Sequence, residues 1–250
     1  MNFYRTALTA IPALSAWLED FKSHFYLNFI DEGRWKYLLE GLGITLQVTL
    51  GALILGILFG FLIAIIRSTS DKADHRGFLL RFLNFLCKVY LTVIRGTPVL
   101  VQLMIMYYVI IASPTADKRL VAILSFGINS GAYVAEIIRS GIMSIDNGQF
   151  EAGRSLGFNY TQTMALIIMP QAFKNVLPAL ANEFITLLKE TSICGYIGLA
   201  ELTRGGDKIR SQTFEAFMPL IAVAVIYLAM VMLLSAGVSR LERRLRTSER

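Results

Sequence analysis

The chain has 250 residues, of which 55% are hydrophobic and only 17% are charged, and its mean hydropathy is +0.56. Soluble domains carry about one quarter charged residues. This composition excludes a disordered chain, a nucleic-acid-binding arm and a small disulfide-bonded scaffold.

Residues 1–36 precede the strongly apolar part of the chain and are predicted to form a separate extracytoplasmic segment. Leu14, Leu18, Phe21 and Phe25 recur at helical spacing and share one face. This pattern is typical of an amphipathic helix that lies on a membrane surface. An ordinary packed helix has the same pattern, and the sequence alone leaves both interpretations open.

Three uncharged runs predict membrane-spanning helices in the rest of the chain. Residues 41–66, 96–116 and 216–239 contain 26, 21 and 24 residues without a charged side chain. A helix needs about 20 residues to cross roughly 30 Å of hydrocarbon. The sequence therefore predicts an all-α, polytopic membrane protein.

We expect residues 37–250 to form one transmembrane domain with five spans. A proline in the second span, Pro98, removes a helical hydrogen bond and predicts a kink. The third and fourth spans carry ionisable side chains, which must face protein or a water-filled path. The uncharged residues 155–173 are too rich in Asn, Thr and Gln to be a sixth span. The expected spans are about 42–66, 86–112, 120–140, 176–196 and 216–239.

The distribution of Lys and Arg predicts the orientation. With the N-terminus outside, five spans place 13 of the 24 basic residues in inside segments and 9 in outside segments, and Arg95 and Lys189 lie in spans. Short loops on the cytoplasmic side carry an excess of basic residues. The C-terminus and the segment 141–174 are therefore expected in the cytoplasm, and the net charge of +6 reflects orientation in the bilayer and not a nucleic-acid partner.

No catalytic or cofactor motif is evident in the sequence. It has no G-x-x-x-x-G-K-[ST] loop for a nucleotide phosphate. Cys87 and Cys194 are expected to be packed thiols, and no spacing suggests a metal site. An intramembrane enzyme is disfavoured, since no Ser/His, paired Asp or metal cluster occurs. If ATP drives this protein, another chain must bind and hydrolyse it.

The segment 141–174 is too long for a plain connector, and loops of this length are usually functional. A short helix beginning near Asn147 would place Glu151 in an early turn, with small residues beside it at Ala152 and Gly153. Gly157 would end this helix. The segment is predicted to dock a cytoplasmic partner; a helix lying on the membrane surface is the alternative.

This segment resembles a known motif. Importer permeases of the ABC superfamily carry an EAA---G---------I-LP loop, and the chain matches it except at Gly153 and Met169, where the family usually has Ala and Leu. Both departures exchange residues of similar size. The matching positions are Glu151, Ala152, Gly157, Ile167 and Pro170.

Three further stretches resemble the polar amino acid branch of that family. They are the RGTPVLVQ sequence of residues 95–102, the GAYVAE sequence of residues 131–136 and the NEFI sequence of residues 182–185. The motifs follow in the family's order and spacing, and the similarity runs from about residue 41 to residue 240. Residues 1–36 lie outside it.

The resemblance implies a permease subunit that imports amino acids across a bacterial plasma membrane. Its partners would be a second permease subunit, identical or related, a dimer of cytoplasmic ATPase subunits that hold ATP-Mg, and an extracytoplasmic solute-binding protein. The loop helix would sit in a groove of the ATPase, with Glu151, Ala152, Gly153 and Gly157 as coupling residues. A secondary transporter or channel, and an ABC permease for another small solute, are the alternatives.

Candidate substrate contacts lie on polar faces of the spans. An amino acid needs acceptors for its ammonium and donors for its carboxylate, and amides, hydroxyls and a carboxylate supply them. Glu183 is the preferred contact for a positive group, and Arg95 is expected to be a structural or gate element beside Pro98. For each candidate the alternative is hydrogen bonding between helices, and Glu136 has Arg139 as a possible ion-pair partner. The candidates are Met104, Tyr107, Asn129, Tyr133, Asn182 and Glu183.

Overall fold

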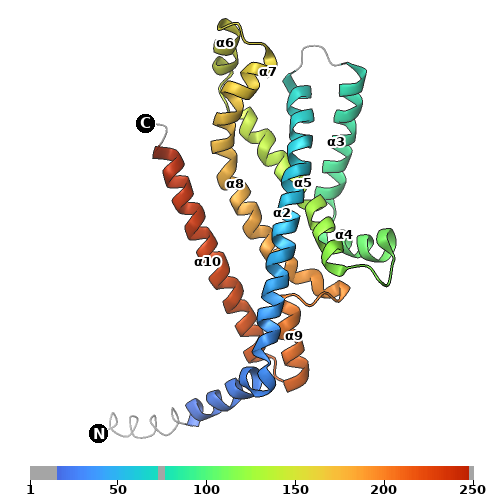
Figure 1. Ribbon diagram of the computed structural model, residues 1–250, viewed down its shortest axis with the longest axis vertical. Coiled ribbons are helices and arrows are strands. Elements are labelled where there is room, and N and C mark those ends of the chain that lie inside the picture. Colours follow the sequence, from blue (N-terminus) through green and yellow to red (C-terminus); the bar gives the residue numbers. More distant parts are fainter. Residues whose placement is uncertain (1–15, 73–76, 248–250) are drawn as a thin grey trace, which may run out of the picture. The chain divides into compact units, whose positions relative to one another are not determined.

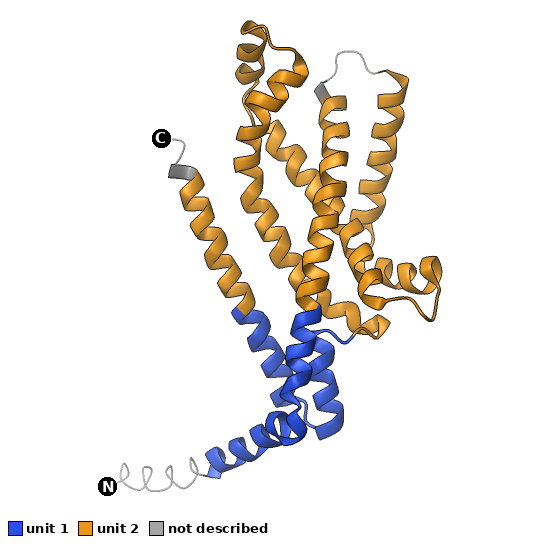
Figure 2. Ribbon diagram, in the orientation of Figure 1, with its two compact units in different colours: residues 1–44, 200–229 blue, residues 45–199, 230–250 orange. Residues whose placement is uncertain are grey.

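The computed structural model describes residues 16–72 and 77–247, and within them every regular element is a helix (Figure 1). Residues 1–15, including Leu14 of the expected amphipathic face, lie outside the described residues. The chain divides into two compact units, one of residues 1–44 and 200–229 and one of residues 45–199 and 230–250, here called unit 1 and unit 2 (Figure 2).

Four helical segments are long and apolar enough to cross a membrane, and a bent pair adds a fifth. This confirms the all-α, polytopic prediction. The four are α2 (Trp35–Lys72), α5 (Lys118–Met143), the stretch Tyr160–Ile197 and α10 (Phe217–Thr247). The bent pair joins α3 (Phe78–Gly96) to α4 (Val99–Ile105) with its continuation η3 (Met106–Ile111), at an angle of 107°.

The bend between α3 and α4 is a full break of the helix at Pro98, sharper than a kink within one span. Thr97 adopts an extended backbone, as steric contact with a following proline favours. The break leaves carbonyls at the end of α3 without helical partners. The Gln102 side chain satisfies two of them, because its Nε2 donates to the carbonyls of Ile94 at 2.7 Å and Thr97 at 3.1 Å.

The fourth span begins earlier than the expected residue 176. A capping box of Asn159 and Gln162 starts α7 (Tyr160–Thr163), and the helix continues through the π-helical η4 (Met164–Ile168). Pro170 then directly follows this π-helical turn, near the start of α8 (Met169–Glu190). The polar residues before 176 therefore extend the helix, and η5 (Thr191–Ile197) ends it.

The core of unit 2 forms around α5. Val134, Ile138 and Ile142 of α5 are buried against Ile168 of η4 and Val176 of α8. Glycines allow the helices to approach closely on both sides of α5. A Cβ on Gly60 of α2 would lie 2.5 Å from Val134, and one on Gly141 would overlap Val176. The Gly56-x-x-x-Gly60 spacing thus serves packing of α2 against α5.

Unit 1 contains a helix over residues 16–25, η1 (Tyr26–Ile30), η2 (Asp31–Gly33), α9 (Leu202–Thr213) and parts of α2 and α10. The first helix carries an aromatic row on one face. The rings of Trp17, Phe21, Phe25 and Phe29 follow one another with centroid distances of 5.6, 6.4 and 5.1 Å. The face expected from the sequence therefore continues to Phe29, which is buried.

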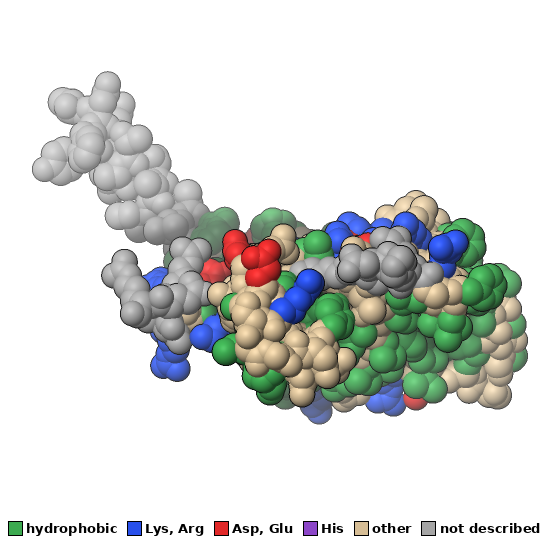
Figure 3. Space-filling model, turned by 90° about the horizontal axis from the view of Figure 1, so that it is seen from above, with side chains coloured by type: hydrophobic (Ala, Val, Ile, Leu, Met, Phe, Trp, Pro, Cys, Tyr) green, Lys and Arg blue, Asp and Glu red, His purple; other side chains and the backbone are tan. Residues whose placement is uncertain are grey.

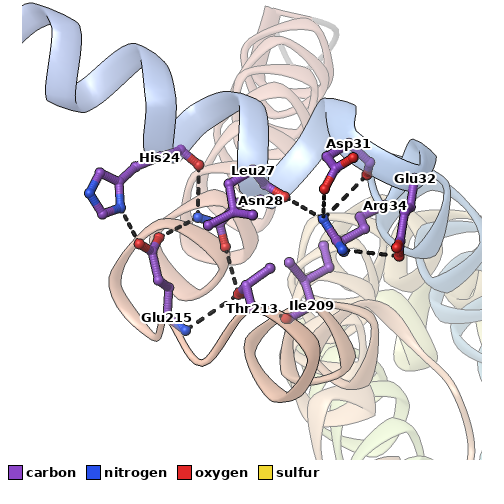
Figure 4. Close-up of polar contacts among 9 residues, drawn as sticks. All are labelled: His24, Leu27, Asn28, Asp31, Glu32, Arg34, Ile209, Thr213 and Glu215. Atoms are coloured by element: carbon purple, nitrogen blue, oxygen red, sulfur yellow. Dashed lines mark hydrogen bonds and ion pairs between the residues drawn. The ribbon is translucent and has the colours of Figure 1, made fainter.

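A polar cluster ties this N-terminal helix to the connection between α9 and α10 (Figure 4). The Glu215 carboxylate accepts hydrogen bonds from His24 and from the amide of Asn28, and Thr213 Oγ1 donates to Asn28 Oδ1 at 2.9 Å. The hydrogen bond to Glu215 and the charge of Glu215 raise the pKa of His24, and Asp20 adds to the shift.

The N-terminus of α9 is capped by a fully buried carboxylate, Glu201. Its oxygens accept from the backbone N–H groups of Thr203 at 2.7 Å and Arg204 at 2.9 Å, and from the Tyr227 hydroxyl at 3.3 Å. Burial raises the pKa of Glu201, and these donors oppose the shift. Capping of this kind satisfies helix N–H groups that have no helical partner.

Candidate functional site

The candidate coupling residues lie on or beside a short helix of unit 2, α6 (Asn147–Ser155). The Asp146 side chain caps its start, accepting from the backbone N–H of Gly148 at 2.6 Å. Gly157 ends it with a left-handed backbone, φ 83°, which glycine adopts without strain. The Phe158 N–H donates to the Gly153 carbonyl at 3.0 Å and the Gly157 N–H to the Arg154 carbonyl at 2.9 Å, which forms a Schellman motif.

The two faces of α6 have different surroundings. Phe150 and Gly153 are buried on the face that packs within unit 2, whereas Glu151 and Ala152 are exposed. A Cβ on Gly153 would lie 2.6 Å from the Thr163 side chain. Gly153 therefore allows close contact between α6 and α7, and the close approach of another protein at Ala152 and Gly153 stays a prediction. Leu156 follows the helix and is 71% exposed.

The exposed face of α6 belongs to the end of unit 2 from which Figure 3 views the molecule. Acidic and basic side chains are visible on this end surface, with hydrophobic side chains beside them. Charged and hydrophobic side chains that lie side by side are suited to the polar rim and apolar centre of a protein interface.

A second candidate region is a pocket of about 430 Å³ within unit 2. Residues of α3, α5 and α8 line it, and these include Arg95, Tyr133 and Glu183 from the sequence-based candidates. The remaining lining residues are Glu136, Ile137, Ser140, Gly141, Ser144, Asn175 and Ala179. The lining therefore offers both signs of charge, together with hydroxyl and amide groups.

Glu183 both lines the pocket and joins two helices. Its Oε1 accepts a hydrogen bond from Ser130 Oγ of α5 at 2.8 Å. Ser130 is fully buried. A bond between helices and a substrate contact need not be alternatives, because a carboxylate has a second oxygen and further lone pairs. Glu183 is thus oriented by one bond and retains the capacity for another.

Arg95 lies at the C-terminal end of α3, where a cation interacts favourably with the helix dipole. Its guanidinium carbon is 5.5 Å from the centre of the Tyr133 ring, a cation–π geometry. Arg95 and Glu183 therefore supply a positive and a negative group to the same pocket.

Glu136 is engaged by a basic residue of its own helix. Arg139 donates to its two carboxylate oxygens at 2.6 and 3.3 Å, and also reaches Asp71 of α2 at 3.4 Å. The ion pair that the sequence offered as the alternative for Glu136 is present.

The other candidates lie outside the lining of this pocket. Asn129 is buried and donates to Gln102 Oε1 at 2.9 Å, which joins α5 to α4. Asn182 is exposed on α8. Met104 lies on α4 and Tyr107 on η3, where Tyr107 packs edge-on against Tyr108 at 4.8 Å.

Comparison with known proteins identifies the family. Residues 77–247 match the family described as binding-protein-dependent transport system inner membrane component, which is more than half of the chain. The chain belongs to this family. This permease is therefore a multi-pass membrane protein of a transport system, and its relatives are transport permeases.

Two bacterial relatives illustrate the similarity. The arginine transport system permease protein ArtQ of Bacillus subtilis is 37% identical, and the match covers 85% of this permease and 94% of ArtQ. The glutamine transport system permease protein GlnP of Escherichia coli is 38% identical, with 84% and 93% covered.

Solved structures agree with the fold. A crystal structure of an amino acid ABC transporter with histidines has a chain that is 40% identical, with a TM-score of 0.77 over 86% of this permease and 98% of that chain. An inward-facing structure of the MetNI methionine ABC transporter has a TM-score of 0.71 at 20% identity, covering 84% and 97%, and supports the fold alone.

Several pocket residues of the permease were not among the candidates chosen from the sequence. Ser140, Ser144 and Asn175 line the pocket, and Asn175 Nδ2 donates to Ser144 Oγ at 3.1 Å. The sequence could have indicated the two serines, because Tyr133, Ile137, Ser140 and Ser144 follow one another at spacings of three or four and so share one helix face. Asn129, a candidate on the same helix, is instead rotated toward α4, where it donates to Gln102 Oε1.

Proposed function

We propose that this permease is the membrane subunit of an ATP-driven amino acid importer. The pocket that carries both Arg95 and Glu183 is the observation that supports this most strongly. A free amino acid presents a carboxylate and an ammonium group, and the two side chains offer a complementary charge to each. Relatives named for the transport of arginine and glutamine support the same substrate class.

In this proposal Arg95 receives the substrate carboxylate and Glu183 receives its positive group. The Ser130 hydroxyl holds the Glu183 carboxylate in position. Glu183 has no basic partner among the ion pairs of the described residues, so a substrate ammonium or guanidinium would supply one. Basic or amide-bearing amino acids are therefore preferred over acidic ones.

In this scheme α6 transmits the movement of the ATPases to the permease. The exposed Glu151 and Ala152, with Leu156, form the contact to a cytoplasmic ATPase dimer, which binds ATP-Mg. Closure of the ATPases would push α6 and change the access of the pocket. In this scheme the permease itself needs no cofactor or metal. A second identical or related permease completes the path, and an extracytoplasmic binding protein delivers the substrate.

The orientation follows from the charge distribution. The α6 end of unit 2 faces the cytoplasm, the N-terminus lies outside and the C-terminus inside, in a bacterial inner membrane. Two exposed serines test this orientation, Ser155 of α6 and Ser211 of α9. In a background without Cys87 and Cys194, a Ser155→Cys variant should react with a membrane-impermeant maleimide only from inside, and Ser211→Cys only from outside. The reverse pattern would overturn the orientation.

The function is tested by isolating the tagged permease with its bound proteins. We expect an ATPase and a second permease subunit to copurify, and the matching binding protein to bind a basic or amide-bearing member of a labelled amino acid panel. Purification of the permease alone from a mild detergent, together with binding of sugars in place of amino acids, would contradict the proposal.

A further inference from the structure

A second pocket of unit 2, of about 540 Å³, has a strongly basic lining. Three cationic side chains contribute to it, Arg67 of α2 and Lys88 and Arg95 of α3. Glu136 is the one carboxylate in the lining, and both of its oxygens already accept from Arg139. The remaining lining residues are Leu91, Thr92 and Gly96.

The charge of this pocket is not balanced by the part of the protein that the structure describes. Among residues 16–72 and 77–247, no ion pair joins Arg67, Lys88 or Arg95 to a carboxylate. The Nε atom of Arg67 is buried without a hydrogen-bond partner there. A buried donor left unsatisfied is unfavourable, and like charges brought together repel. Both features would be relieved by an anion with several acceptor oxygens.

The position of the pocket points to the membrane as the source of that anion. Arg67 directly follows the uncharged run of residues 41–66, which places it at the edge of the hydrocarbon. α2 and α3 run in opposite directions (Figure 1), and side chains tilt toward the N-terminus of their helix. Arg67 and Arg95 therefore lean toward each other from the two ends of the pocket.

The surface next to the pocket is suited to acyl chains. α3 exposes a series of large apolar side chains on the turns that carry Lys88: Phe82, Phe85, Leu86 and Val89. A basic pocket at the membrane surface that adjoins an apolar helix face fits the headgroup and the chains of one lipid molecule. A free phosphate ion would occupy the basic pocket but would leave the apolar helix face uncovered.

We propose that this pocket binds the phosphate of an anionic phospholipid from the leaflet on the α6 side. The Arg67 guanidinium donates to the phosphate oxygens, Lys88 adds a point charge, and Thr92 offers a hydroxyl, while Arg95 remains available to the substrate carboxylate. Guanidinium groups pair well with phosphate because their N–H groups match its geometry. The lipid phosphate offsets the unpaired charges of Arg67 on α2 and Lys88 on α3, so it holds these two helices together beside the candidate substrate pocket.

The test uses the purified transporter complex in nanodiscs of phosphatidylcholine with spin-labelled phosphatidylglycerol as the probe. A salt concentration of about 1 M, where the Debye length is about 3 Å, suppresses attraction to scattered surface charges. Direct contacts within a pocket are screened much less than scattered surface charges, so Arg67→Gln with Lys88→Gln should still lower lipid affinity more than about tenfold.

The matched control is Arg81→Gln, which removes the same charge from an exposed position of the same helix outside the pocket lining. It should change lipid affinity by less than about twofold at this salt concentration. A charge-conserving variant, Arg67→Lys with Lys88→Arg, should assemble and retain the lipid, which separates loss of the site from misfolding.

Three results would overturn the proposal. The first is equal loss of lipid in Arg81→Gln and in the pocket variant, which would mean general surface attraction. The second is displacement of the labelled lipid by inorganic phosphate, which would make a free anion the ligand. The third is displacement by the transported amino acid, which would make the pocket part of the substrate path. The readout is lipid binding, so its outcome does not depend on transport.

Discussion

Glu151 of α6 and Glu183 of α8 belong to the same unit, but different kinds of information determine their surroundings. Glu151 lies on an exposed helix face set by signals within a dozen residues: the Asp146 cap and the turn at Gly157. Glu183 receives its hydrogen bond from a helix 53 positions earlier in the chain, through Ser130. A short surface helix such as α6 is thus encoded locally, whereas a pocket depends on how long helices pack.

The largest effect is expected at α6. Glu151→Lys reverses an exposed charge at the proposed ATPase contact, and unfavourable juxtaposition of charges across an interface costs several kcal/mol. We expect normal amounts of permease in the membrane but at least 100-fold weaker association with the ATPase, measured by copurification. Gln149→Lys adds the same charge beside Gln171, with which Gln149 shares a hydrogen bond, and should have a smaller effect. Native association in Glu151→Lys would contradict the assignment of α6.

At the pocket, Glu183→Gln should reduce transport more than tenfold and leave assembly intact. The change removes the charge proposed to meet the substrate, and loss of one partner of a buried charge pair costs about 2–5 kcal/mol. Ser130→Ala removes the bond between the helices but keeps the charge, so its loss should be smaller. If the two variants lose transport equally, or if Glu183→Gln transports normally, the carboxylate serves only to join helices.

A smaller effect is expected where α6 meets α7. Gly153→Ala would place a methyl group 2.6 Å from Thr163, and overpacking of this kind costs about 1–3 kcal/mol. Hydrogen exchange of residues 147–163 should accelerate. Thr163→Ala removes the two nearest atoms, so the double variant should recover most of the lost protection. If Gly153→Ala retains native exchange but weakens ATPase binding, Gly153 would belong to the partner contact after all.

The smallest effect concerns the polar cluster of unit 1. The pKa of His24 lies above its ordinary value of 6.5 because of Glu215, so protonated His24 favours the folded cluster. Its stabilising contribution is complete below pH 6.5 and is lost as the pH rises through the raised pKa. Hydrogen exchange of residues 16–30, corrected for the intrinsic rate, should therefore be more protected at acidic than at basic pH. His24→Gln should abolish the difference; protection that increases with pH would contradict the contact.

Much of the fold was predictable from the sequence because membrane spans are read from local composition. The uncharged runs within α2 and α10 indicated those spans directly, and Asn147 and Gly157 marked the limits of α6 closely. The early start of the fourth span was not predicted. Its polar surface indicates a loop by composition, but the capping box of Asn159 and Gln162 starts a helix there.

The pocket was predicted only in part, because its lining depends on the rotation of each helix about its axis. Tyr133 and Glu183 lie where the sequence analysis expected a polar path, whereas Asn129 turns to Gln102 and Asn182 is exposed. A rotation of one residue, or 100° along an α-helix, separates a pocket residue from a structural one. The glycine contacts of Gly60 and Gly141 help to set this rotation, and their partners lie far away in the sequence.

Uptake of a labelled basic or amide-bearing amino acid into proteoliposomes tests most directly whether the permease belongs to an ATP-driven amino acid importer. The vesicles would contain the permease with its copurified ATPase, the binding protein would face the permease's outer side, and ATP-Mg would be supplied to the ATPase side. We expect uptake against the substrate gradient, and we expect this uptake to require ATP, the binding protein and the ATPase together. Uptake that persists without the ATPase, driven by an ion gradient or down the substrate gradient, would contradict it.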